Sequence, residues 1–103
     1  MILHLAAFTW TEEVDADQVR SLTAALEEMA AGIPQLLSYR CGENLRLRPG
    51  GADYAVAALV ADEEALSAYL DSAAHADVYE RLLGRMIASR AAAQLEVPDG
   101  GRI

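Results

Sequence analysis

Two segments of this sequence read as β-strands that are apolar on both faces. They are residues 2–10, ILHLAAFTW, and residues 53–61, DYAVAALVA. In the first, alternate residues fall into two sets, neither of them polar: Ile2, His4, Ala6, Phe8 and Trp10 on one face, and Leu3, Leu5, Ala7 and Thr9 on the other. Strands of this kind are buried on both faces. The chain must therefore cover both sides of its sheet.

The length of the chain limits what can provide that cover. With 103 residues there is room for one domain, which we expect over residues 1–98, followed by a short tail at residues 99–103. A domain of this size is marginal alone and often dimerises. Only 6% of the residues are aromatic. A core of small side chains tends to leave thin packing or a cavity, which favours a ligand pocket.

The spacing of apolar residues predicts the remaining elements. Between the two strands, Asp15 is a candidate N-cap for a helix with one apolar stripe, and Gly32 and Pro34 stop this helix. The stripe consists of Val19, Leu22, Leu26, Met29 and Ile33. A strand is expected at residues 35–41, with Leu37, Tyr39 and Cys41 on one face. After the third strand come a helix opening at Asp62 with Leu66 and Tyr69 inward, a helix over residues 74–88, and a last strand at residues 91–97.

This order predicts an α+β fold of the ferredoxin-like type, β-α-β-β-α-(α)-β, with an antiparallel four-stranded sheet. Helices would cover one face of the sheet. The other face would be bare although its residues are apolar: Leu3, Leu5, Ala55, Ala57 and Leu59. A second copy of the same sheet is the simplest cover. We therefore predict a homodimer whose two sheets close into an α+β barrel.

Charge and composition exclude several classes of function. A net charge of −8 makes nucleic acids and anionic membranes poor partners. Every basic residue is an arginine, so no lysine can form a Schiff base or a P-loop. The single cysteine, Cys41, excludes an internal disulfide and reads as a buried structural thiol. The N-terminus lacks signal-peptide features and no apolar run reaches a membrane span, which favours a cytoplasmic protein.

Several short motifs together resemble one family. They are HLAAFTW at residues 4–10, IPQL at residues 33–36, GEN at residues 42–44, DY at residues 53–54 and ALSAYLDSAAH at residues 65–75. Their order and spacing resemble the stress-responsive A/B barrel domain (Dabb) family, a set of small dimeric α+β barrels. Many members have no known activity. One is a plant polyketide cyclase that uses a tyrosine and a histidine for an intramolecular aldol condensation.

The resemblance implies a set of site residues. The catalytic pair of the cyclase matches Tyr69 and His75, although Ser72-Ala73 stands here in place of its His-Pro. The first-strand histidine of the family matches His4, and Tyr54 stands where the cyclase has another histidine. His75 would then be the general base and Tyr69 the hydrogen-bond donor, with His4 and Tyr54 shaping the pocket. The expected pocket walls are Ala6, Phe8, Leu22, Leu26, Val56 and Val78.

These residues imply a cofactor-independent cyclase or related lyase acting on a polyketide or similar hydrophobic intermediate, with no metal. Neither histidine has the spacing of a helical metal pair. Two other interpretations stay open. The chain could be a non-catalytic dimer that binds a small molecule, with His75 merely capping the following helix and Tyr69 packing in the core. It could also be a cofactor-free monooxygenase that uses Trp10 and Tyr54. The alanine-rich, all-arginine composition suggests a GC-rich bacterial source.

Overall fold

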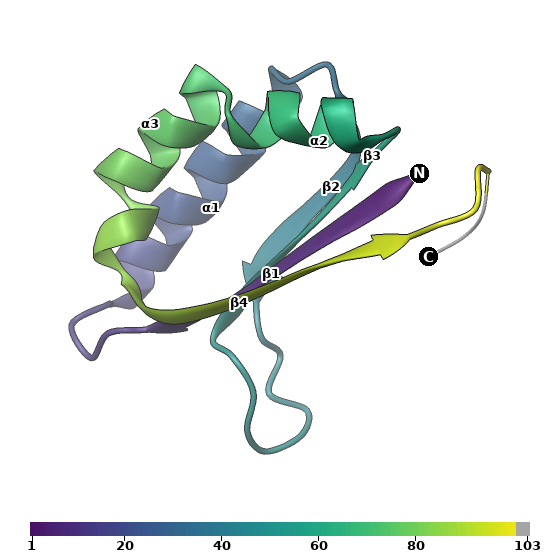
Figure 1. Ribbon diagram of the computed structural model, residues 1–103. Helices are drawn as coiled ribbons and strands as arrows, with labels where there is room; N and C mark the ends of the chain where they lie inside the picture. The colour runs from purple at the N-terminus through teal and green to yellow at the C-terminus, as the bar shows by residue number, and fades with distance from the viewer. Residues whose placement is uncertain (101–103) are drawn as a thin grey trace.

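The computed structural model describes residues 1–100 of the chain. The elements along the chain are β1 (Ile2–Trp10), α1 (Ala16–Ala31), β2 (Leu36–Glu43), β3 (Tyr54–Val60), α2 (Glu63–Leu70), α3 (Ala73–Arg81), the short 3-10 helix η1 (Leu83–Arg85) and β4 (Ile87–Glu96). The predicted ferredoxin-like order is therefore confirmed. Figure 1 shows the sheet as one layer and the helices as a second layer packed on it.

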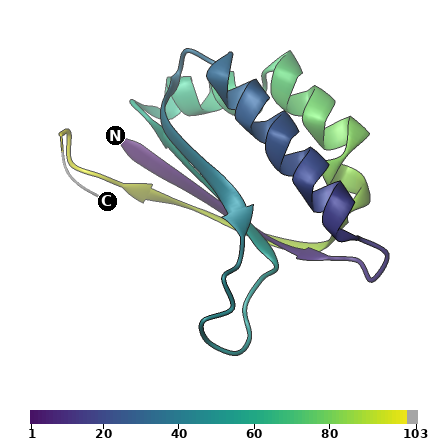
Figure 2. The ribbon, with the colours of Figure 1, turned by 180° about the vertical axis from the view of Figure 1, so that it is seen from behind.

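The sheet is antiparallel throughout and has the strand order β2-β3-β1-β4. The first strand pairs with both β3 and β4, so that Ala6 lies between Val56 and Ala92, and His4 between Ala58 and Gln94. Side chains at these positions point to the face that carries the helices. Seen from behind in Figure 2, all three α-helices still lie on that one side.

The first helix is held by the signals expected from its sequence. Asp15 accepts a hydrogen bond from the backbone N–H of Gln18, and the Gln18 side chain accepts one from the backbone N–H of Asp15, which forms a capping box. The predicted stripe is buried against the sheet, with Leu22 fully inaccessible. The helix ends at Ala31, before Gly32. Its buried face contributes Val19, Leu22, Leu26 and Met29 to the core.

The structure corrects the end of the predicted helix over residues 74–88. The helix α3 stops at Arg81, and β4 begins at Ile87, four residues before the predicted strand. Gly84 sits in the turn between them, where an added Cβ would lie 2.9 Å from the backbone oxygen of Tyr79. The chain turns back sharply there, and Ile87 pairs with Trp10 in the sheet. Strand pairing with β1 therefore overrides the helical spacing of this segment.

The predicted inward face of β2 needs a second correction. Tyr39 and Cys41 do face the helices, opposite Ala58 and Val56. Leu37, by contrast, falls at a shift of register between Leu36 and Ser38, and its side chain is 55% exposed. A bulge at this point turns one residue of the strand out of the alternation.

The sheet face opposite the helices is apolar and open. It carries the residues predicted to meet a second subunit, together with alanines of β4. The members are Leu3, Leu5, Ala7, Ala55, Ala57, Leu59, Ala91, Ala93 and Leu95. Leu3 is buried between its strand neighbours, whereas Leu95 is 50% exposed. Within the described part of the chain, nothing packs on this face, so a homodimer through it stays our prediction.

Met1 lies beside Val97, just after the end of β4 (Figure 1). The backbone N–H of Val97 donates to the carbonyl of Met1, and the Met1 ammonium pairs with the Asp99 carboxylate at 3.0 Å. The predicted tail at residues 99–103 thus begins with an ion pair, while its residues 101–103 lie outside the described residues. No helix within residues 1–100 is long and apolar enough to cross a membrane.

Candidate functional site

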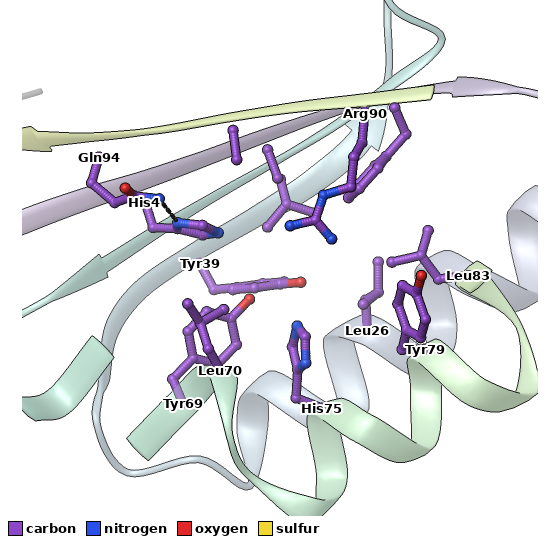
Figure 3. Close-up of a pocket in the computed structure, with 14 residues that line it drawn as sticks. His4, Leu26, Tyr39, Tyr69, Leu70, His75, Tyr79, Leu83, Arg90 and Gln94 are labelled. Carbon is purple, nitrogen blue, oxygen red and sulfur yellow. Dashed lines mark hydrogen bonds between the residues drawn. The ribbon is translucent and has the colours of Figure 1, made fainter. Parts of the chain in front are cut away.

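A cavity of about 160 Å³ lies between the inner face of the sheet and the α2–α3 segment. Its walls include Ala6, Phe8, Leu26 and Val56, four of the six apolar residues expected there. Seven polar side chains from five elements line it, and Figure 3 labels them all: His4, Tyr39, Tyr69, His75, Tyr79, Arg90 and Gln94. The cavity is open toward β4, where Arg90 and Gln94 are exposed.

The corner between α2 and α3 brings Tyr69 and His75 together. Tyr69 lies in the last turn of α2 and is 2% exposed. The chain then turns, and Ser72 is the N-cap of α3. Its hydroxyl accepts a hydrogen bond from the backbone N–H of His75. The two rings meet edge to face with their centroids 5.3 Å apart. Ser72 rather than His75 is therefore the helix cap, and the His75 imidazole is free to point into the cavity (Figure 3).

His4 enters the cavity from the middle of β1. The side-chain amide nitrogen of Gln94 lies 2.9 Å from the Nδ1 atom of His4. An amide NH₂ can only donate, so this assignment makes Nδ1 the acceptor and places the ring proton on Nε2. In Figure 3 the Nε2 edge of the ring faces the cavity. His4 therefore presents an N–H donor, 6.3 Å between centroids from the ring of Tyr69.

Both histidines are held in the neutral form. Burial lowers the pKa of His75, and the nearby Arg90 guanidinium lowers it further, while Asp71 acts in the opposite direction. Burial also lowers the pKa of His4, with His75 and Arg90 adding to the effect. A neutral imidazole near pH 7 can accept a proton. This state is what a general base at His75 requires.

Tyr39 is a site residue that the sequence did not single out. It comes from β2, and its ring meets that of Tyr69 edge to face at 6.3 Å between centroids. Its hydroxyl is buried and makes no hydrogen bond within residues 1–100. Burial raises the pKa of the Tyr39 phenol, and the neighbouring Tyr69 raises it further. Burial likewise raises the pKa of Tyr69, so both phenols stay protonated and can donate.

Arg90 and Gln94 were also missed. The last strand was expected to begin after Arg90, and Gln94 within that strand was not assigned to either face. In the sheet, Arg90 lies opposite Phe8 and Gln94 opposite His4. Alternation along β4 therefore points both side chains to the helical side. The signal was present in the sequence as Arg90-x-Ala92-x-Gln94, which matches the two-residue period of β1.

Three residues predicted to line the pocket lie in the core instead. The Tyr54 hydroxyl points toward α1 and shares a hydrogen bond of 2.7 Å with Thr23, and burial raises its pKa. Leu22 and Val78 are buried where the helices meet the sheet. Cys41 is half-buried beside this core, and burial raises the pKa of its thiol. Within residues 1–100, no group of three or more potential metal ligands comes together.

The neutral histidines make stability depend on pH. Because the pKa of each is lower in the folded chain, the unfolded chain binds more protons below about pH 6.5. The contribution of the two neutral histidines to the free energy of unfolding is fully present above that pH. It is lost as the pH drops through their pKa values in the folded chain. Urea unfolding from about pH 7.5 to about pH 5 should therefore show a falling free energy of unfolding.

The matched variant for this prediction replaces both histidines. The chain has only two, His4 and His75, so the double substitution His4→Gln/His75→Gln removes every imidazole. The free energy of unfolding of the double variant should change less with pH than that of the wild type over the same pH range. An equally steep decline in both proteins would show that other groups cause it.

The unpartnered Tyr39 hydroxyl predicts a substitution that stabilises the free protein. A buried polar group without a partner costs roughly 1–3 kcal/mol. Tyr39→Phe keeps the ring and removes that group, so the melting temperature should rise by about 4–8 °C for each kcal/mol gained. Tyr79→Phe is the control, because Tyr79 is 43% exposed and its hydroxyl reaches water. A lower melting temperature for Tyr39→Phe would mean that the hydroxyl has a partner after all.

Comparisons with known proteins match the whole described fold. The family model "Stress responsive A/B Barrel Domain" matches residues 2–97. An uncharacterised protein of Streptomyces coelicolor is 34% identical over 77 residues, which cover 73% of this chain and 79% of the relative. A dimeric ferredoxin-like protein of unknown function from Thermobifida fusca superposes with a TM-score of 0.87 at 35% identity, covering 93% of this chain and 90% of the other.

A second similar structure is a hydroxynitrile lyase from Passiflora edulis. It superposes with a TM-score of 0.77 over 91% of this chain and 90% of its own, at 10% identity. At that identity the likeness shows a shared fold and nothing about a shared reaction.

Proposed function

Because this chain belongs to the stress-responsive A/B barrel domain family, we propose that it is a cofactor-independent, cyclase-like enzyme. Its substrate would be a polyketide or a similar intermediate with carbonyl groups two carbons apart. The reaction would be an aldol-type proton transfer and ring closure inside the cavity. A relative of the same fold that is named as a lyase supports the idea that such a scaffold can carry carbonyl chemistry.

One observation carries this proposal: a neutral imidazole and a protonated phenol face the same small cavity. The rings of His75 and Tyr69 lie 5.3 Å apart between centroids. Burial keeps the first able to accept a proton and the second able to donate a hydrogen bond. Removal of a proton next to a carbonyl needs these two functions within reach of adjacent substrate atoms.

The steps follow from that arrangement. His75 takes the proton from the carbon between two carbonyl groups, and the electron pair of the broken C–H bond moves into an enolate. Tyr69, with the His4 Nε2–H beside it, donates hydrogen bonds to the enolate oxygen. The enolate carbon forms a bond to a second carbonyl carbon of the same molecule. The proton on His75 then passes to the new alkoxide, so no oxidant or other reactant is consumed.

The size of the cavity restricts how much of the substrate it holds. At about 160 Å³ it resembles a cavity that accommodates a benzene ring, about 150 Å³. The reacting segment of a short polyketide fills that space. The rest of a longer chain would extend through the opening at β4. This favours a short chain, with its ring-forming carbons inside and its end at the mouth.

Ring closure itself is the test. The purified protein is incubated with a linear tetraketide acid, and cyclised product is followed by NMR and mass spectrometry against a protein-free control. We expect ring closure by carbon–carbon bond formation to be faster with protein. Saturable binding of the acid without any acceleration would overturn the proposal in favour of a non-catalytic binding dimer.

A further inference from the structure

The cavity has an unusual chemical inventory for so acidic a chain. Its polar lining is rich in hydrogen-bond donors and holds one cation: the Tyr39 and Tyr69 hydroxyls, the His4 Nε2–H and the Arg90 guanidinium, beside the His75 ring, the Tyr79 hydroxyl and the Gln94 amide. No aspartate or glutamate lines it, although the chain has 16 of them and a net charge of −8. Several donors and a cation, with no carboxylate of the protein beside them, fit a ligand that brings its own negatively charged oxygens.

Arg90 lacks the partners that most other arginines of the chain have. Arg20, Arg46 and Arg81 form ion pairs with aspartates. Arg40 and Arg48 donate to backbone carbonyls. Within residues 1–100, the guanidinium of Arg90 has neither kind of partner. It extends from β4 over the cavity toward His75 and Tyr39, as Figure 3 shows.

The buried Tyr39 hydroxyl is a second, independent sign of a missing ligand. It is inaccessible to solvent, and even with the Tyr69 hydroxyl beside it, it makes no hydrogen bond of good geometry within residues 1–100. Buried hydroxyls in proteins are nearly always hydrogen-bonded, so one left alone on a cavity wall indicates an absent acceptor. Tyr39 and Arg90 approach the cavity from opposite edges of the sheet, from β2 and β4. A ligand that supplies acceptors to both must lie in the cavity between them.

We propose that Arg90 binds the carboxylate of the substrate, and that the ligand class of this site is a β-oxo carboxylic acid in its anionic form. The proposal rests on the proposed function for the role of His75, and adds Arg90 as the residue that selects the substrate. The carboxylate lies at the mouth, where Arg90 can pair with it in a bidentate manner. The oxo group lies deeper, against the Tyr39, Tyr69 and His4 donors.

This arrangement also fixes the orientation of the substrate. In a β-oxo acid, one methylene carbon separates the carboxylate from the carbonyl. With the carboxylate on Arg90 and the carbonyl oxygen on the phenols, that carbon lies toward His75, because His75 lines the same cavity next to Tyr69. Arg90 is therefore a positioning and specificity residue, because it holds the substrate with its reacting carbon next to His75.

Two probes of nearly equal size and shape test the charge preference directly. Acetoacetate and acetylacetone differ mainly in that a carboxylate replaces an acetyl group. Binding of each is titrated by NMR or calorimetry near pH 7.5, without any turnover. A charge-assisted bidentate pair predicts that the wild type binds acetoacetate roughly 10- to 100-fold more tightly than acetylacetone.

Variants at Arg90 assign the preference to one residue. In Arg90→Met the two probes should bind with equal affinity, while acetylacetone binds as in the wild type. Arg90→Lys should restore part of the preference for acetoacetate, because lysine keeps the charge but cannot form the bidentate pair of a guanidinium with a carboxylate. Arg48→Met removes the same charge from the hairpin loop, away from the cavity, and should leave the preference intact. Thermal melts verify that each variant is folded.

The outcomes separate this inference from the proposed function. Equal affinities of the two probes in the wild type, including no binding of either, would overturn it, as would a preference that survives in Arg90→Met. If the Arg90-dependent preference holds while no ring closure is found, the carboxylate site stands and the proposed reaction is wrong. If ring closure depends on His75 but the preference does not depend on Arg90, only the present inference is wrong.

Discussion

Replacing His75 by glutamine should lower the rate of tetraketide ring closure by roughly 10²- to 10⁴-fold, the usual contribution of a general base. Glutamine retains much of the size of the imidazole and its ability to hydrogen-bond, but it cannot accept a proton at neutral pH. The cap that orients this residue uses its backbone N–H and the Ser72 hydroxyl. The fold around α3 should therefore survive the substitution.

The other histidine is the matched control for this substitution. His4→Gln changes the same atoms in the same cavity, but His4 is placed as a donor to the substrate oxygen rather than as the base. It should lower the rate of ring closure less than His75→Gln does. The same holds for Tyr69→Phe, which removes one hydrogen bond and keeps the ring. The pH-rate profile adds a signature: its acid limb should lie below about pH 6.5, since burial lowers the pKa of His75. Wild-type rates in His75→Gln would rule it out as the base.

The second large effect concerns assembly. Ala55 is exposed on the open sheet face of the single chain, so Ala55→Glu places a carboxylate in water as long as the chain is alone. In a face-to-face dimer two such carboxylates would be buried, at several kcal/mol each. The dissociation constant of the dimer should then rise by more than about 10³-fold. A similar structure is a dimeric ferredoxin-like protein, and the open apolar face is the interface that we expect here.

Light scattering across a dilution series measures this effect. We expect a dimer for the wild type, with a buried area above about 1,600 Å², and a monomer for Ala55→Glu. Ala24→Glu is the control, because Ala24 is equally exposed but lies on the outer side of α1; it should remain dimeric. A wild-type monomer at micromolar concentration, or an unaffected Ala55→Glu dimer, would contradict the barrel.

The sequence predicted the fold well because its strongest signals are local. The Asp15 cap, the stripe of α1 and the two-sided apolar strands each depend on a few neighbouring residues. The prediction failed where tertiary pairing decides. Residues 82–88 belong to the predicted helix, yet Leu83–Arg85 form a 3-10 turn and Ile87 pairs with Trp10 as the first residue of β4. No local pattern in the sequence indicates whether the helical spacing or the strand pairing determines the structure of this segment.

The candidate site was predicted in part for the same reason. His4, Tyr69 and His75 came from motifs, and all three line one cavity. Tyr54 was placed on the correct face of its strand, but its length carries the hydroxyl past the cavity to Thr23. Arg90 and Tyr39 were missed because they come from the two edge strands. Their approach to one point depends on the curvature of the whole sheet, which the sequence does not express.

The short corner between α2 and α3 acts as an adjustable spacer. Tyr69 lies in the last turn of one helix and His75 in the first turn of the next, with only Asp71 and Ser72 between the two helices. Each residue of an α-helix advances about 100° around its axis. A single insertion or deletion in α3 before His75 would swing the imidazole by that angle, away from Tyr69, without disturbing the sheet. Changes in a few corner residues can therefore retune or abolish reactivity while leaving the barrel intact, so related barrels with identical architecture need not share a reaction.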